Sequence, residues 1–131
     1  MNQNPIVPGN SSLGALVTLT AAATGGNSTD QVNTTWRGLT VGINVSAITG
    51  TSPTLVVTIQ GKDPASGTYY TLLASASITA AGYTTLTVYP GLPATANVSA
   101  NALLPQNWRV LYAITGTTPA VTATVSAVQQ V

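Results

Sequence analysis

The sequence predicts an all-β protein, an antiparallel β-sandwich of about eight short strands in a jelly-roll-like arrangement. Apolar residues alternate with Thr, Ser and Asn along several segments, as they do in strands that bury one face. Turn residues, mainly Gly, Pro and Asn, interrupt the alternation about every eight to twelve residues. No segment combines good helix formers with a period of about 3.6 residues, and Glu is absent from the chain.

The first part of the chain predicts an arm, a strand and a loop. Residues 1–12 contain two prolines and a glycine and are expected to form an extended arm, with residues 13–131 as a single domain. In the first strand, Leu13, Ala15, Val17, Leu19 and Ala21 are expected to share one face. Residues 23–35 are rich in Gly, Asn and Thr and are expected to form a loop.

The clearest alternation begins at Leu39 and continues to the C-terminus. Its first strand points Leu39, Val41, Ile43, Val45 and Ala47 to one face. The next strand, 54–60, ends at the turn sequence GKDPASG (61–67), where Pro and Gly favour chain reversal. In the strand after that turn, the inward face is expected to hold Tyr70, Leu72, Ala74, Ala76 and Ile78. Further strands are predicted around Leu86 and Val88 and at 98–104, 108–114 and 121–127.

A nine-residue phrase occurs twice, as AITGTSPTL (47–55) and as AITGTTPAV (113–121). In each copy Gly allows the backbone to reverse, and Pro stands where a new strand begins. We therefore expect one hairpin turn used twice as scaffold. A duplicated binding loop and a duplicated half-domain are the alternatives.

Charge and composition exclude several functional classes. Charged residues make up 4% of the chain, against about 25% in typical soluble domains. The three cations are scattered, so no basic patch for nucleic acid is expected, and no apolar run is long enough for a membrane helix. The N-terminus lacks the basic start and apolar run of a signal peptide.

The residue inventory also argues against catalysis. His, Cys and Glu are absent, and the two carboxylates, Asp30 and Asp63, are far apart in sequence. Thiolate, Ser–His and zinc chemistry are therefore missing, and a carboxylate pair requires these two residues to meet. We expect that the protein is not an enzyme and has no metal or cofactor.

Two Trp–Arg pairs suggest contact residues, because Trp and Arg are enriched at protein interfaces. Trp108 leads an alternating apolar face and is expected in the core, whereas Trp36 stands at a loop–strand junction and either environment is open. The residues selected as candidate interface residues are Trp36, Arg37, Arg109, Tyr69 and, in the arm, Pro5 and Val7.

The tyrosines offer a second kind of site. Tyr69 and Tyr70, with Tyr83 and Tyr89, could form a platform that binds carbohydrate. The simpler interpretation is cross-strand aromatic packing with the hydroxyls at a wet edge.

The shortage of charge predicts self-association. Soluble β proteins protect their edges and surfaces with charged side chains, and here the outward faces consist of Thr, Ser, Ala and Asn. Such a surface suits burial in a symmetric assembly, because no charge has to be desolvated. We therefore expect a homotrimer or another homo-oligomer, with the arm reaching onto a neighbour.

One stretch carries a family resemblance. The succession LVVTIQGKDPASGTYYTLLASASIT, LTVYPGL and LPQNWRVLYAIT resembles the short all-β virion proteins of tailed bacteriophages, over roughly residues 38–131. The resemblance implies a capsid decoration (cement) protein, frequently trimeric, that binds the major capsid protein on the outer shell and stabilises it. It also implies synthesis in the host cytoplasm and location on the virion. A neck, tail or head-fibre component and a carbohydrate-binding module are the alternatives.

Overall fold

The computed structural model describes residues 10–131, so the arm residues Pro5 and Val7 lie outside the described residues. The all-β prediction is confirmed, since every element of the described chain is a strand. Nothing in this part of the chain forms a helix that could cross a membrane. The strands are β1 (Asn10–Ala22), β2 (Gly26–Asn27), β3 (Gln31–Val32), β4 (Gly38–Lys62), β5 (Tyr69–Ala74), β6 (Gly82–Val88), β7 (Ser99–Ala100) and β8 (Asn107–Gln130).

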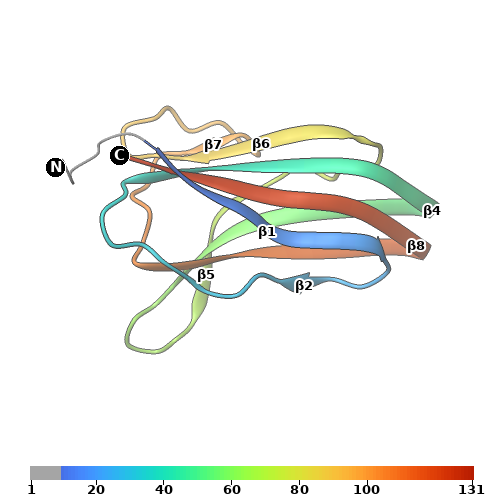
Figure 1. The fold of residues 1–131 in the computed structure, drawn as a ribbon, viewed down its shortest axis with the longest axis horizontal. Helices are drawn as coiled ribbons and strands as arrows, with labels where there is room; N and C mark the ends of the chain where they lie inside the picture. Colours follow the sequence, from blue (N-terminus) through green and yellow to red (C-terminus); the bar gives the residue numbers. More distant parts are fainter. Residues whose placement is uncertain (1–9) are drawn as a thin grey trace, which may run out of the picture.

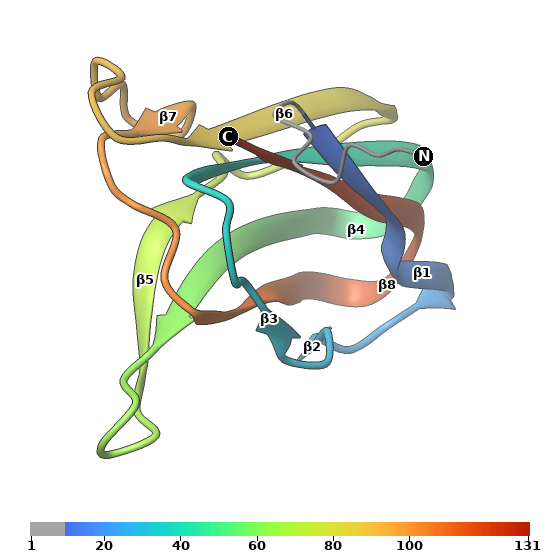
Figure 2. The same ribbon diagram turned by 60° about the vertical axis from the view of Figure 1, so that its left-hand side comes forward.

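Two long strands form the spine of the molecule. β4 and β8 pair antiparallel along almost their whole length, from Gly38 opposite Gln130 to Gly61 opposite Trp108. Halfway along, this two-stranded ribbon bends back on itself, so that its two halves face each other (Figure 1, where the bend lies at the right; Figure 2). The predicted pairs of separate strands, 39–47 with 54–60 and 108–114 with 121–127, are therefore the two halves of β4 and of β8.

Short strands flank each half of the ribbon. The half that contains the start of β4 and the end of β8 is extended by β6 on one side and β1 on the other. The other half is extended by β5 on one side and by β2 and β3 on the other. β7 pairs parallel to β6, so all eight strands form one mixed, open sheet.

The repeated phrase forms the bend, and the prediction of two hairpin turns is wrong. Neither copy reverses the chain onto its own neighbour; instead the two copies pair with each other. Ile48 lies opposite Val121, Thr51 opposite Thr117, and Leu55 opposite Ile114. This register relates the two copies by a local two-fold axis that passes through the Thr51–Thr117 pair.

The backbone of the bend follows the same symmetry. Gly50 and Gly116 both have φ +121°, a conformation that side chains rarely allow. Each glycine lies against the main chain of the other copy: a Cβ on Gly50 would lie 2.8 Å from the Thr118 oxygen, and one on Gly116 2.9 Å from the Ser52 oxygen. Two glycines are thus required where two backbones approach closely, which explains why the phrase occurs twice.

The core fills the space between the two halves of the sheet. The predicted inward residues of 39–45, 55–59 and 121–127 are all buried there, and Trp108 is completely enclosed. Leu86 and Val88 of β6 are also fully buried, as the alternation predicted.

The predicted inward face of β5 is wrong by one residue. Leu73 is buried, whereas Tyr70 is 45% exposed. Ile59 pairs with Leu73 and the next residue, Gln60, pairs with Thr71, so Leu72 is an extra residue that shifts the register. Because side chains alternate between faces, this one-residue shift exchanges the inward and outward sets.

β1 differs from its prediction in length and regularity. It begins at Asn10, so residues 10–12 belong to the strand and not to the arm. Val17 and Leu19 are buried, but Ala15 and Ala21 are exposed, because the pairing with β8 changes register three times. Such bulges twist an edge strand and oppose pairing with other chains, so this edge is protected without charges. The predicted strand at 98–104 is reduced to β7.

Candidate functional site

Three of the charged residues gather around one aromatic ring. Arg109 of β8 stacks on Tyr69, with its guanidinium carbon 3.4 Å from the ring centroid, and its Nε donates to the Gln60 side chain at 2.8 Å. The Tyr69 hydroxyl donates to both carboxylate oxygens of Asp30, at 2.8 and 2.9 Å. Lys62 closes the group with an ion pair to Asp30 at 3.0 Å. We call these five residues the charge cluster.

The charge cluster connects four parts of the fold. Asp30 lies in the loop between β2 and β3, Lys62 ends β4, Tyr69 begins β5, and Arg109 belongs to β8. The Tyr69 hydroxyl, and after it Lys62, hold the pKa of Asp30 below its usual value, and the same carboxylate raises the pKa of Lys62. The sequence predicted Tyr69 and Arg109 as contact residues; in the structure their polar groups are engaged within the chain.

The second carboxylate serves a turn. Asp63 accepts hydrogen bonds from the main-chain N–H and the hydroxyl of Ser66, at 2.8 and 2.5 Å, and these lower its pKa. Asp30 and Asp63 thus bind different partners and do not act as a pair. No group of three potential metal ligands occurs in residues 10–131.

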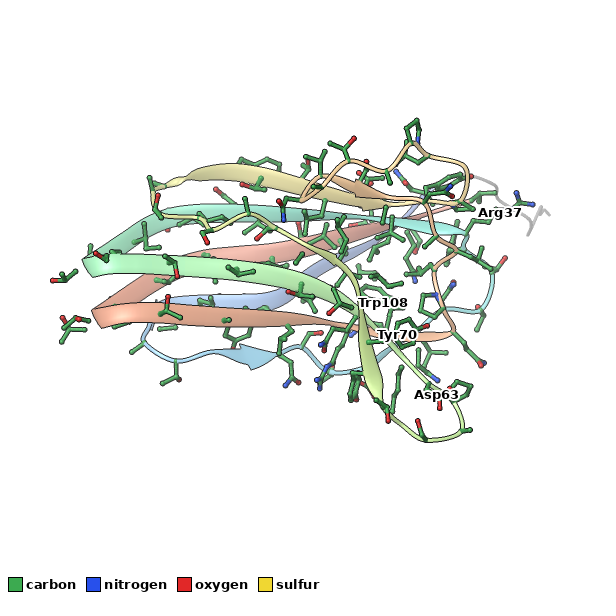
Figure 3. All side chains as sticks on the ribbon, turned by 180° about the vertical axis from the view of Figure 1, so that it is seen from behind. Arg37, Asp63, Tyr70 and Trp108 are labelled. Atoms are coloured by element: carbon green, nitrogen blue, oxygen red, sulfur yellow. The ribbon has the colours of Figure 1, made fainter. Side chains whose placement is uncertain are left out.

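The best-defined hollow of the described chain opens at the end of the molecule opposite the bend. It has a volume of about 510 Å³ and is formed where the β3–β4 connection meets the segment before β8. Figure 3 places Arg37 at this end, on the other side from Asp63. We call it the end hollow; its lining residues are Asn33, Thr34, Thr35, Trp36, Arg37, Leu103, Leu104 and Gln106.

Asn33 fixes the walls of the end hollow. Its buried side chain donates to the main-chain oxygens of Trp36 and Leu104, at 2.7 and 3.2 Å, and accepts from the Trp36 N–H at 2.8 Å. Its own N–H donates to the Gln106 oxygen at 2.6 Å. These bonds join the two segments that line the hollow, so its shape is built into the fold.

The side chains at the mouth of the hollow are free by comparison. Arg37 is exposed, and its side chain has no hydrogen-bond or ion-pair partner within residues 10–131, although its main chain bonds to Gln130 and Leu104. Trp36 is half-buried, Leu103 is 62% exposed, and nearby Val32 is 64% exposed. A cation therefore stands beside a partly exposed aliphatic and aromatic surface.

The two tryptophans have different environments. Trp108 is fully buried, which confirms its predicted place in the core, and its indole Nε1 is the buried side-chain polar atom without a partner in the described chain. Trp36, for which the sequence left core and surface open, lies at the hollow.

The tyrosines lie on glycines of neighbouring strands. A Cβ on Gly61 would meet the Tyr70 ring, one on Gly42 the Tyr83 hydroxyl, and one on Gly38 the Tyr89 ring. Tyr83 and Tyr89 stand at opposite ends of β6, about 20 Å apart at about 3.3 Å per residue, so they do not form one platform. This cross-strand packing is the simpler of the two interpretations of the sequence.

Sequence analysis missed Asn33 and Leu103. Asn33 stands three residues before Trp36, a spacing compatible with a local side-chain cap, but its bond to Leu104 joins segments that the sequence does not connect. Comparisons of the chain with protein families, curated proteins and solved structures find no match.

Proposed function

We propose that the protein is a structural component of a larger assembly. The observation that carries this proposal is the distribution of charge. Four of the five charged side chains are engaged in the charge cluster or the Asp63 turn, and the rest of the described surface is made of Thr, Ser, Ala, Asn and a few exposed apolar residues. Such a surface can be buried against another protein without desolvating ions.

The specific role that we propose is decoration of a bacteriophage capsid, with the major capsid protein as partner. The support for it is the resemblance of residues 38–131 to short all-β virion proteins, together with an all-β fold. In this proposal the folded-over sheet acts as a β-sandwich of jelly-roll type, and the copies form a homotrimer or another homo-oligomer. The role requires no catalytic group, cofactor, nucleic acid or membrane.

The mechanism is mechanical. Each copy buries a neutral surface across neighbouring shell subunits, so that separating those subunits also requires removing the bound copy. Binding energy from many weakly bound copies adds up over the shell because the sites are linked through one lattice.

Co-sedimentation with intact shells from the same source tests the proposal, after the mass of the free protein has been measured in solution. Saturable binding in a fixed ratio to capsid subunits is the expected result. A monomer that remains in the supernatant at every shell concentration would contradict decoration. Rings or stalked trimers that ignore shells would instead favour a neck, tail or fibre component.

The arm has its own test. Deletion of residues 1–9 leaves all of β1 in place, so the fold is expected to remain intact. If the arm reaches a neighbouring subunit, this truncated protein binds shells or its own copies more weakly. Unchanged binding would remove the arm, with Pro5 and Val7, from the interface.

A further inference from the structure

The end hollow combines a fixed frame with unsatisfied side chains. Asn33 pins both walls through four hydrogen bonds, and the Arg37 main chain is held on both sides, by the Gln130 oxygen at 2.8 Å and the Leu104 N–H at 2.9 Å. A frame that is already ordered loses little conformational entropy when a ligand binds. The side chains that it presents, Arg37 and Leu103, are not needed to hold the frame.

The charge balance of the molecule selects an anion for this place. Asp30, Asp63, Lys62 and Arg109 sum to zero, so the formal net charge of +1 corresponds to Arg37. A guanidinium pairs with a carboxylate through two parallel hydrogen bonds, and the low charge elsewhere on the surface leaves this attraction without local competition.

The occupant is not a second copy of this chain. The sequence contains two acidic residues and both are occupied: Asp30 by Tyr69 and Lys62, and Asp63 by Ser66. A side-chain carboxylate for Arg37 therefore has to come from a different protein. The apolar walls at Trp36 and Leu103 also require an aliphatic neighbour beside that carboxylate.

We propose that the end hollow binds an acidic segment of a partner protein, with a Glu or Asp carboxylate on Arg37 and an adjacent aliphatic side chain against Trp36 and Leu103. The inference rests on the proposed function in taking the partner to be another protein of the assembly. It names the chemistry of the contact, which the proposed function leaves open.

The test uses the full-length protein and two matched probes, the blocked tripeptides Leu-Glu-Leu and Leu-Gln-Leu, which differ in one charge. The chain has two tryptophans, so its NMR spectrum has two indole N–H signals. The signal of Trp36 reports on the hollow, and that of Trp108, which is fully buried, is the internal reference. We expect the Glu probe to shift the Trp36 signal with an affinity about tenfold above that of the Gln probe, as for one charge-assisted bond.

Two variants with the same change in net charge separate the site from a general charge effect. Arg37→Gln is expected to abolish the preference for the Glu probe, whereas Lys62→Gln, on the charge cluster, retains it. Equal binding of the two probes, a static Trp36 signal at millimolar probe, or equal losses in both variants would overturn the proposal. Inorganic phosphate that binds as well as the Glu probe would show that the apolar walls contribute nothing, and would also overturn it.

Shell binding distinguishes this inference from the proposed function. If wild-type protein and Arg37→Gln co-sediment equally with shells, decoration stands and the role of the hollow is wrong. If wild-type protein ignores shells but prefers the Glu probe, decoration is wrong and the hollow stands.

Discussion

The two-fold bend makes a quantitative prediction about glycine. Replacing Gly50 or Gly116 by Ala places a Cβ 2.8–3.1 Å from three main-chain atoms of the other copy of the phrase, at φ +121°. The backbone strain costs about 1–3 kcal/mol, and the close contacts cost about 1–3 kcal/mol more. We expect each substitution to lower the free energy of unfolding by about 3 kcal/mol, within the 5–15 kcal/mol typical of native domains.

Urea unfolding measures this effect, and Gly14→Ala is the matched control. Gly14 also has positive φ, at +66°, but a Cβ there meets no atom within 4 Å, so its cost is limited to about 1–2 kcal/mol of backbone strain. With a slope of about 1.5 kcal/mol per molar urea, the midpoint should fall by about 2 M for Gly50→Ala and Gly116→Ala. It should fall by about 1 M for the control.

The symmetry adds a second criterion. Because the two glycines have equivalent surroundings, their substitutions should cost the same within about 0.5 kcal/mol, the accuracy with which independent changes usually compare. A bend in which one substitution is harmless and the other severe, or in which neither exceeds the control, would refute the proposed reason for the repeat.

Three further predictions concern the core and the charges. Trp108→Ala should cost about 3–5 kcal/mol in urea unfolding, whereas Trp108→Phe should cost far less, because it removes a buried N–H without a partner that itself costs about 1–3 kcal/mol; equal losses would contradict this. Tyr69→Phe should raise the pKa of Asp30 towards its usual value, since the Tyr69 hydroxyl is the largest cause of its depression; carboxyl NMR titration measures it, and an unchanged pKa would contradict the cluster geometry. Both Asp pKa values lie below the usual 3.8, so their contribution to stability is present above that pH and is lost as the pH falls through the lower folded-state values. Because the chain has no His or Glu, thermal unfolding should be constant between pH 8 and about 5 and decline only below about 4; a marked fall between pH 7 and 5 would contradict this assignment.

The fold class and much of the core could be predicted because alternation is a local property. Leu39 to Val45 and Val121 to Ala127 are buried as predicted, since each strand there keeps a regular register with its neighbours. The face of β5 could not be predicted, because the bulge opposite Ile59 depends on pairing and not on the sequence of β5 itself.

Both copies of the repeated phrase carry ordinary hairpin signals, and read one at a time they predict two turns. Their true role depends on the pairing of Thr51 with Thr117, which brings together segments about 65 residues apart. The same limitation applies to the site. Trp36 and Arg37 could be selected from residue type, but the bond from Asn33 to Leu104 that builds the hollow around them is a long-range contact.

The continuous ribbon of β4 and β8 also has a consequence for how the chain reaches its folded state. The sequence-nearest pair in this ribbon, Gly61 with Trp108, already requires closing a loop of about 50 residues, and the loop grows towards Gly38 and Gln130. Closure of long loops is entropically costly, and β folds dominated by such contacts fold in milliseconds to seconds. The two copies of the phrase, which in isolation look like the earliest local turns to form, instead lie midway along a zipper that starts at the Trp108 end. The bend is therefore completed only after the two strands have already found each other.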